Sequence, residues 1–373
     1  MELVDTLSEL VSWSTETSNQ SNNQDAIERL GTMFAEMGYQ FSYKDVEGHW
    51  SLYASLKDTD SPETMLLGHI DTVEGKRGWE TNQYDLSAEG HGLGAYDMKA
   101  GIATMLKLAE TKRENVAYLI TSDEEQGGVH GAGVWCNEIF PRFVLIPEPT
   151  DLKVGLGNKG VLNLELNING KSAHSSKPWE GVNALDVLTE FKTKAYDLAV
   201  FNTKTDLGKY STIAHTISNC DNERENQAPD TCSAIFNVRY IPEIKPERVV
   251  DDLRHIMTGM KQKYKAIYSD FAMALAYPKD KIGFIPAVSM SLDNFYVKEL
   301  LSTMKEVGIE PGYHLTDGAS DNRWFWEKGS AVVEFGPKGE GMHAPNERVD
   351  INTLPIYYKA MESFVDKISK ESV

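Results

Sequence analysis

The sequence predicts an α/β protein with a mostly parallel sheet, into which a smaller α+β domain is inserted. Strands that look buried alternate with helical segments over the first 160 residues and again after about residue 280, which is typical of a parallel-sheet α/β fold. Between these parts the strands alternate polar and apolar residues, as strands with one solvated face do. The chain of 373 residues is also too long for one simple core. We therefore expect residues 1–160 and 278–373 to form one domain and residues 161–277 to form the inserted one.

The apolar residues of the first domain recur at helical or strand spacing. We expect a helix at 24–37, with Ile27, Leu30, Phe34 and Met37 on one face and Gly38 at its end. We expect further helices at 98–112, 134–138 and 354–370. We expect strands at 39–44, 51–56, 64–71, 116–122, 143–146 and 331–335.

The inserted segment has the order β-α-β-β-α-β of the split, ferredoxin-like arrangement. Its expected strands are 161–169, 211–218, 232–241 and 266–276, and its expected helices are 183–199 and 246–264. The strand at 161–169 alternates most clearly, so one of its faces should be solvated.

Charge and composition exclude several classes of partner. A net charge of −19 argues against nucleic acid and anionic membranes, because both bind basic surfaces. No apolar run approaches the roughly 18 residues that cross a bilayer, and the acidic N-terminus does not resemble a signal peptide. The three cysteines, Cys136, Cys220 and Cys232, have no CxxC spacing and suggest reduced thiols. We therefore expect a cytoplasmic protein.

Ionisable residues gather where predicted elements begin or end. They are His69, Glu125 and Glu148 after three buried strands, Asp97 at the start of a helix and His343 after a later strand. Ligands of an open α/β sheet bind beyond the carboxyl ends of its strands. Each residue alone has a simpler explanation, such as a helix cap for Asp97 or a turn for Glu148, but the five together indicate a metal site. Imidazole and carboxylate ligands suit zinc, with cobalt or manganese as alternatives, and a set of this size with one bridging member suits two ions about 3.5–4 Å apart.

Two further carboxylates stand beside these ligands. Asp71 lies two residues after His69 on a strand and so faces the same way, where it can orient the imidazole through its other ring nitrogen. Glu124 precedes Glu125, projects differently and stays free to act as general base and then general acid toward a metal-activated water. His69, Asp71 and His343 also match the two-histidine, one-carboxylate triad of non-haem Fe(II) oxygenases. That alternative leaves the other carboxylates unexplained and expects a β-rich barrel.

Six short segments occur in order along nearly the whole chain: GHIDTV (68–73), GLGAYDMKAG (92–101), TSDEE (121–125), EPT (148–150), SAHSSKP (172–178) and MHAPNE (342–347). Together they resemble the co-catalytic zinc family of acetylornithine deacetylases, succinyl-diaminopimelate desuccinylases, aminoacylases and related carboxypeptidases. By this resemblance Asp97 bridges two metal ions, and Glu125 and His343 complete one of them. His69 and Glu148 complete the other. The resemblance also makes Glu124 the general acid/base and Asp71 the residue that orients His69.

The resemblance also assigns roles outside the metal site. The inserted domain would serve as a lid and dimerisation domain, and its His174 would enter the partner subunit's site to stabilise an oxyanion. Asn226 and Arg239 match positions that bind substrate in desuccinylases. Lys159 and Ser320 match positions near the substrate carboxylate. The implied assembly is a homodimer.

The resemblance implies an enzyme that hydrolyses the amide bond of an N-acyl-L-amino acid. Leu93 and the segment 174–184 resemble acetylornithine deacetylases, whereas segments 117–125 and 318–323 and the spacing of Asn226 and Arg239 resemble desuccinylases. We expect N-acetyl-L-ornithine as the substrate, in arginine biosynthesis. N-succinyl-L,L-diaminopimelate is an alternative, as is a peptide cleaved by a dipeptidase or carboxypeptidase. A non-catalytic protein that binds a metal or an amino acid is a further alternative, but it would have no use for a general base such as Glu124.

Overall fold

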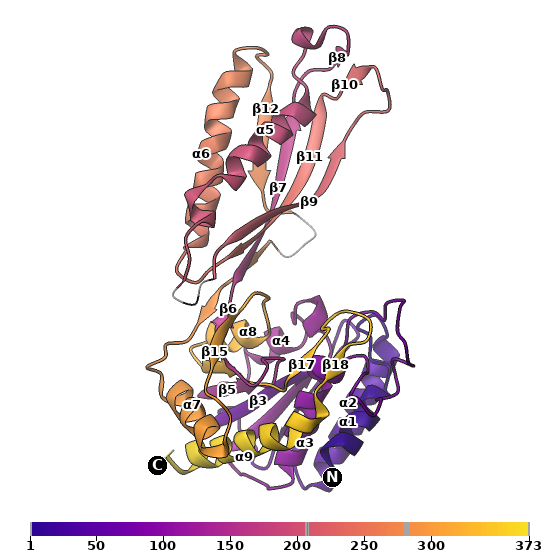
Figure 1. The fold of residues 1–373 in the computed structure, drawn as a ribbon, viewed down its shortest axis with the longest axis vertical. Helices are drawn as coiled ribbons and strands as arrows, with labels where there is room; N and C mark the ends of the chain where they lie inside the picture. The colour runs from indigo at the N-terminus through magenta and orange to yellow at the C-terminus, as the bar shows by residue number, and fades with distance from the viewer. Residues whose placement is uncertain (1, 206, 208, 279–282, 372–373) are drawn as a thin grey trace. The chain divides into compact units, whose positions relative to one another are not determined.

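The computed structural model describes residues 2–205, 207, 209–278 and 283–371, and the chain divides into two compact units (Figure 1). The first unit comprises Met1–Gly157, Ser289–Thr316 and Ser320–Val373, and the second comprises Asn158–Val288 and Asp317–Ala319. The second unit continues to Val288, beyond the expected boundary at residue 277, because β13 (Phe284–Ile285) pairs with β7 (Gly160–Asn169).

The first unit is built on a nine-stranded sheet in the order β1-β2-β4-β3-β5-β16-β6-β14, with β15 also paired to β6. The strands are β1 (Gln40–Val46), β2 (His49–Ser55), β3 (Thr64–His69), β4 (Val116–Thr121), β5 (Phe143–Ile146), β6 (Val154–Asn158), β14 (Val288–Ser289), β15 (Tyr313–Thr316) and β16 (Ala331–Glu334). The four neighbours β4, β3, β5 and β16 run parallel, and β1, β2 and β6 add antiparallel pairs outside them. This confirms the predicted α/β class. Because the parallel strands end at one edge of the sheet, the residues that follow β3, β4 and β5 are brought together there.

Both faces of the central strands are buried. Leu66 and Tyr118 belong to a core that includes residues of the helices α1, α2, α3, α7 and α9, whereas their neighbours Leu67 and Leu119 face the other way and are equally inaccessible. This double burial explains why these strands read as continuous apolar runs. The helices of this unit are α1 (Leu3–Val11), α2 (Gln20–Glu36), α3 (Ala100–Ala109), α4 (Ala132–Trp135), α7 (Phe295–Val307), α8 (Asn322–Trp326) and α9 (Leu354–Glu371).

Three helices differ from their predicted limits. α4 lies slightly earlier than the predicted 134–138, and the other two differ for local reasons. α2 begins earlier than predicted because the side chain of Asn19 caps it by accepting the backbone N–H of Asn22, and it ends as predicted before Gly38 at φ 91°. The helix predicted at 98–112 begins with a distorted turn, η1 (Ala95–Lys99), and continues as α3. Asp97 has non-helical backbone angles inside that turn and caps no helix.

The second unit contains an antiparallel sheet in the order β12-β7-β11-β9, with β13 also paired to β7 (magenta to orange in Figure 1). Its further strands are β9 (Thr212–Cys220), β11 (Thr231–Tyr240) and β12 (Ala272–Ala276), and its longer helices are α5 (Ala184–Tyr196) and α6 (Pro246–Lys265). The two helices pack on each other and on the sheet around a separate core. A small ribbon of β8 (Ala173–His174) and β10 (Gln227–Ala228) completes this unit.

Two predictions for this unit are wrong. The strand predicted at 266–276 begins only at Ala272, because Ile267 and Phe271 make turn hydrogen bonds back to Tyr264 and Tyr268. Cys220 and Cys232 are not reduced thiols but form a disulfide. They lie directly opposite each other on β9 and β11, so strand pairing provides a proximity that their spacing in sequence did not reveal.

Cys136 is a free, buried thiol. None of the helices in the described part of the chain is long and apolar enough to cross a membrane.

Candidate metal centre

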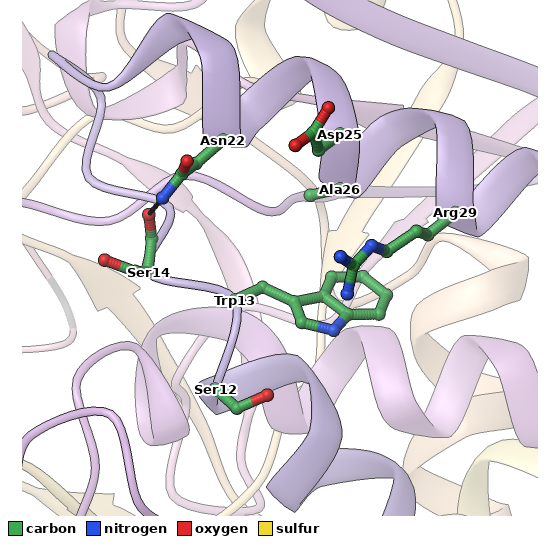
Figure 2. Close-up of a pocket in the computed structure, with 7 residues that line it drawn as sticks. All are labelled: Ser12, Trp13, Ser14, Asn22, Asp25, Ala26 and Arg29. Carbon is green, nitrogen blue, oxygen red and sulfur yellow. Dashed lines mark hydrogen bonds between the residues drawn. The ribbon is translucent and has the colours of Figure 1, made fainter.

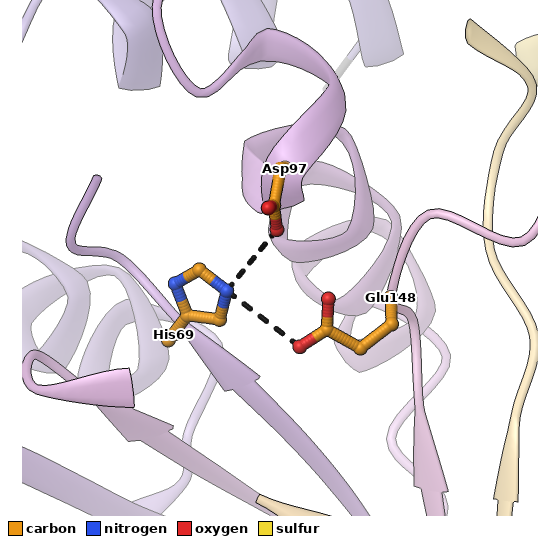
Figure 3. A group of neighbouring side chains, drawn as sticks. All are labelled: His69, Asp97 and Glu148. Atoms are coloured by element: carbon orange, nitrogen blue, oxygen red, sulfur yellow. Dashed lines mark ion pairs between the residues drawn. The ribbon is translucent and has the colours of Figure 1, made fainter. Parts of the chain in front are cut away.

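His69 ends β3 and is 2% exposed, so its imidazole lies inside the edge of the sheet. Its Nδ1 donates to the backbone carbonyl oxygen of Asp71 at 2.9 Å. A carbonyl can only accept, so Nδ1 carries a proton and Nε2 is the nitrogen left for a metal. Figure 3 shows Nε2 facing two carboxylates, 3.3 Å from Asp97 Oδ1 and 3.6 Å from Glu148 Oε1.

Asp97 is positioned by the backbone turn that carries it. The carboxylate of Glu347, which is 1% exposed, accepts hydrogen bonds from the backbone N–H groups of Gly94, Tyr96 and Asp97 at 3.0, 2.9 and 2.9 Å. Gly94 has φ 72°, and a Cβ there would lie 2.4 Å from the Thr72 side chain, so the turn requires glycine. The Asp97 Oδ1 atom is buried and accepts no hydrogen bond from the described residues.

His343 and Glu125 lie on the other side of Asp97. His343 follows β17 (Gly339–Glu340), and its Nε2 lies 3.0 Å from both Asp97 Oδ2 and Glu125 Oε1. Glu125 stands in η2 (Glu124–Gln126), a single 3-10 turn after β4. The His343 side chain is 43% exposed, so this side of the centre is open to solvent.

These contacts form two ligand groups that share one carboxylate. Within each group the ligand atoms all lie within 4.8 Å of one another, and the groups are His69, Asp97 and Glu148, and Asp97, Glu125 and His343. The five predicted ligands are therefore brought together from five separate segments of the first unit. Their grouping matches the partition that the family resemblance implied.

The charges of the cluster favour bound cations. Burial raises the pKa of Glu148 well above its usual value, and the nearby Asp97 raises it further. Burial would also raise the pKa of Asp97, but the neighbouring imidazoles of His343 and His69 outweigh it and hold that pKa low. Hydrogen bonds to Asp97 and Glu125 raise the pKa of His343 to about 10. Without a metal, the protonated imidazole of His343 supplies the positive charge beside these carboxylates, and a divalent ion would supply more. The nitrogen and carboxylate donors of the cluster suit zinc.

Asp71 is fully buried and connects the His69 strand to the turn of Glu124. Its carboxylate accepts the backbone N–H groups of Glu124 and Glu125 at 3.3 and 3.2 Å and the Thr17 hydroxyl at 3.0 Å. The same carboxylate lies 3.5 Å from His69 Nδ1, so the closer partner of the imidazole is the Asp71 carbonyl. The Asp71 carboxylate therefore orients the turn more directly than it orients the imidazole.

The carboxylate of Glu124 belongs to neither ligand group of the described residues. Burial raises the pKa of Glu124 well above its usual value, and the nearby His69 lowers it. Glu124 is thus a carboxylate beside the ligands that remains available for proton transfer.

The alternative iron triad is not assembled. Asp71 lies on the Nδ1 side of His69, whereas His343 contacts the cluster through Asp97. Within the described ranges His69, Asp71 and His343 form no ligand group. The parallel-centred sheet also differs from the β-rich barrel that this alternative expects. We therefore reject it.

His174 and Asn226 are neighbours in the second unit. β8 ends at His174 and pairs with β10, which begins directly after Asn226. The two side chains lie 3.5 Å apart, from Nε2 to Nδ2. The backbone N–H of Ser176 donates to His174 Nδ1 at 3.1 Å, so the neutral ring carries its proton on Nε2. The exposed His174 can therefore act as a hydrogen-bond donor.

Arg239 lies near the end of β11, in the larger sheet of this unit, and Lys159 directly precedes β7. Arg239 pairs with Val161 across β11 and β7, close to Lys159 in the chain. β11 begins at Thr231, three residues after the β10 strand that pairs with His174. From Thr231 to Arg239 the strand advances eight residues, or roughly 27 Å, and this separates Arg239 from the His174 end of the unit. Lys159 is 5% exposed and forms an ion pair with Asp317 at 2.8 Å. The four predicted residues of this unit therefore occupy two separate places.

Ser320 belongs to the first unit and is buried. Its hydroxyl donates to Glu334 Oε1 at 2.5 Å, and the Asn322 side chain donates to the same oxygen at 2.6 Å. The hydroxyl of Thr316 donates to the other oxygen at 2.9 Å. The Ser320 hydroxyl is thus engaged by a buried carboxylate at the end of β16.

The residues that hold the ligand-bearing turns were not predicted from the sequence. Glu347 ends the segment MHAPNE (342–347), in which only His343 was given a role. Its acidic side chain in that segment was the one signal that could have marked it. Arg323 donates to the carbonyl oxygens of Gly127 and Ser320 and so fixes the end of the η2 turn. Thr17 reaches Asp71 across 54 residues, and no local pattern announces such a contact.

Comparisons with known proteins show which family and fold this chain resembles. Residues 65–367 match the peptidase family M20/M25/M40. A succinyl-diaminopimelate desuccinylase from Sulfurovum sp. (strain NBC37-1) is 25% identical over 98% of this chain and 98% of its own length. A tripeptidase from Staphylococcus aureus has a TM-score of 0.80 at 19% identity, over 99% of this chain and 98% of that one. A dinuclear metal-binding peptidase of the M20 family from Bacillus subtilis has a TM-score of 0.69 at 15% identity, over 99% of this chain and 98% of that one.

The chain belongs to the peptidase family M20/M25/M40, because the family match covers most of its length. It is therefore a hydrolase, and the resemblance found in the sequence is confirmed at the level of the family. At these identities the two solved structures bear on the fold alone, and they support the α/β architecture.

Proposed function

We propose that the protein hydrolyses the amide bond of an N-acyl-L-amino acid with two divalent metal ions. The observation that carries this proposal is the pair of ligand groups that share Asp97, with the free carboxylate of Glu124 beside them. One ion would be held by His69, Asp97 and Glu148, and the other by Asp97, Glu125 and His343. The description of the Bacillus subtilis relative as a dinuclear metal-binding peptidase supports two ions.

Zinc is the ion we propose, since imidazole and carboxylate are its common ligands, and cobalt or manganese accept the same donors. Ions bound at this place polarise a carbonyl oxygen and lower the pKa of water.

The protein's own residues would move the proton. Glu124 takes one proton from the water that attacks the carbonyl carbon and delivers it to the amide nitrogen as the C–N bond breaks. The water oxygen stays on the acyl carbon and its second proton also passes to the released amine, so the products are a carboxylate and an ammonium group. Asp71 holds Glu124 in place by accepting its backbone N–H. The Asp71 carbonyl keeps a proton on His69 Nδ1, so that Nε2 serves as the ligand.

We also propose that His174 acts in the partner subunit of a homodimer. His174 and Asn226 lie at one end of the second unit, and Arg239 and Lys159 lie at the other end. A small substrate cannot contact both ends, because the strand between them spans roughly 27 Å. The two ends would therefore serve different active sites. His174 would donate its Nε2 proton to an oxyanion in one site, and the Arg239 and Lys159 side chains would face a substrate carboxylate in the other.

The first candidate substrate is N-succinyl-L,L-diaminopimelate. The Sulfurovum relative bears the desuccinylase name over 98% of both chains, and segments 117–125 and 318–323 resemble desuccinylases. N-acetyl-L-ornithine, which the sequence favoured, becomes the second candidate, because it rests on Leu93 and segment 174–184 alone. Both compounds are intermediates of amino-acid biosynthesis, and we propose a cytoplasmic setting for that reason.

The test is amine release by metal-stripped and zinc-restored protein. The substrates are the two candidates, N-acetyl-methionine and a dipeptide, and zinc-loaded Glu124→Gln is the control for the chemical step. We expect zinc-dependent turnover concentrated on one N-acyl amino acid. Turnover that is indifferent to metal would contradict the proposed reaction. Turnover of the dipeptide alone would replace the acyl substrate with a peptide.

A further inference from the structure

A polar pocket lies in the first unit where α1 leads into α2, and none of the proposed metal ligands lines it (Figure 2). Its volume is about 230 Å³, and it is lined by Ser12, Trp13, Ser14, Asn22, Asp25, Ala26 and Arg29. Sites for drug-sized molecules measure roughly 300–1,000 Å³, so this pocket suits a smaller metabolite. None of its residues has a role in the proposed reaction.

The pocket presents two opposite charges that do not pair with each other. Asp25 and Arg29 are four residues apart on α2, a spacing at which such side chains often form an ion pair. The two side chains form no ion pair with each other here, and neither side chain has another hydrogen-bond or ion-pair partner among the residues that the structure describes. The Arg29 guanidinium instead lies 5.6 Å from the centre of the Trp13 ring. Figure 2 shows the small side chain of Ala26 between the two charged groups, which leaves space beside them.

The opposite wall of the pocket is rigid. Trp13 is 8% exposed and packs in the core, so its ring cannot swing away. Ser14 has φ 44°, and the side chain of Asn22 donates to its carbonyl oxygen at 2.9 Å. The next residue, Thr15, is buried and donates to the carbonyl oxygen of Ile70 at 2.7 Å. A ligand would therefore meet a wall that is already ordered, which favours binding.

We propose that this pocket binds a free α-amino acid, with the ligand carboxylate on Arg29 and the ligand ammonium on Asp25. Side chains four residues apart on a helix have Cβ atoms about 5–6 Å apart, which suits a small ligand that carries both charges. A purely anionic ligand would be repelled by Asp25, and a purely cationic ligand would be repelled by Arg29. The small exposed part of the Trp13 side chain would give the rest of the ligand an apolar contact. The product amine of the proposed reaction belongs to this class, but the site does not depend on that reaction.

The experiment follows the indole N–H resonance of Trp13 by NMR in protein labelled with ¹⁵N-tryptophan, and Trp13→Phe assigns that resonance. L-methionine is titrated into zinc-loaded and zinc-free protein. Two analogues are titrated alongside it: N-acetyl-methionine, which lacks the ammonium, and methionine amide, which lacks the carboxylate. We expect a saturable shift with methionine in both forms of the protein and at least tenfold weaker binding of each analogue.

Variants locate the site. Arg29→Gln and Asp25→Asn should each weaken methionine binding at least tenfold, and because both residues are exposed, the fold should persist in circular dichroism. Arg248→Gln is the matched control, since Arg248 is an exposed helical arginine that pairs with Asp252 four residues on. It should bind methionine as the unmodified protein does.

Three outcomes would overturn the proposal: no shift of the Trp13 resonance at millimolar methionine, equal binding of either analogue, or unchanged binding in both pocket variants. A saturable shift in zinc-free protein supports the site even if no N-acyl amino acid is hydrolysed. The failure of the pocket and the failure of the proposed reaction are thus distinguishable.

Discussion

At the scale of single residues, Glu124 is the side chain that separates metal binding from chemistry. We predict that Glu124→Gln binds both ions but loses turnover by on the order of 10²–10⁴-fold, because only the proton carrier is removed. Metal analysis together with steady-state kinetics measures the two effects. Glu74→Gln, an exposed change two residues beyond Thr72, should keep full activity. Turnover near that of the unmodified enzyme would remove Glu124 from the mechanism.

Metal uptake should release protons. The pKa of His343 is about 10 in the metal-free cluster, since hydrogen bonds to Asp97 and Glu125 favour its charged form. His343 is therefore protonated at pH 8 and must lose that proton to become a ligand. We predict that metal affinity rises with pH up to about this pKa. Calorimetry at pH 8 in buffers of different ionisation enthalpy should give heats that vary with the buffer, and identical heats in all of them would contradict the prediction.

The residues of the candidate site differ in how far the sequence could predict them. His69, Glu125 and Glu148 could be predicted as candidate ligands because each ends or follows a strand with a clear apolar run. Ser320 could not be predicted in this way, because it lies in a loop and its buried partner Glu334 lies on β16, and only the folded chain brings the two together. Such contacts depend on strand pairing, which local patterns do not specify.

At the scale of elements, Glu347 ties the His343 segment to the turn of Asp97. We predict that Glu347→Ala leaves three buried N–H groups unpaired, which costs several kcal/mol and lowers Tm by roughly 5–10 °C. Metal affinity should fall as well, because the Asp97 turn is no longer held. Glu340→Ala, an exposed change in the same segment, is the control. An unchanged Tm and metal affinity in Glu347→Ala would show that other contacts hold the turn.

Most helices and central strands could be predicted because their apolar spacing is strong, and β5 begins and ends at its predicted residues. The shortest elements could not. β13 and β14 each comprise two residues, too few for any period to appear. The disulfide escaped prediction for a related reason, since the register of β9 against β11 decides which cysteines face each other.

At the scale of the whole molecule, the proposal that His174 acts in trans makes a dimer the active form. We predict that Glu124→Gln and His174→Ala, each nearly inactive alone, regain activity when unfolded together and refolded as a mixture. Each mixed dimer would hold one site with an intact Glu124 and an intact partner histidine, so statistical mixing gives roughly a quarter of full activity. No recovery in a sample that contains mixed dimers would place His174 in its own chain's site or outside the mechanism.

Anomalous X-ray diffraction from crystals of the zinc-loaded protein would show whether two metal ions share Asp97. We predict two zinc peaks about 3.5–4 Å apart, one beside His69 and Glu148 and the other beside Glu125 and His343, with Asp97 between them. A single peak, or peaks that Asp97 does not touch, would contradict it.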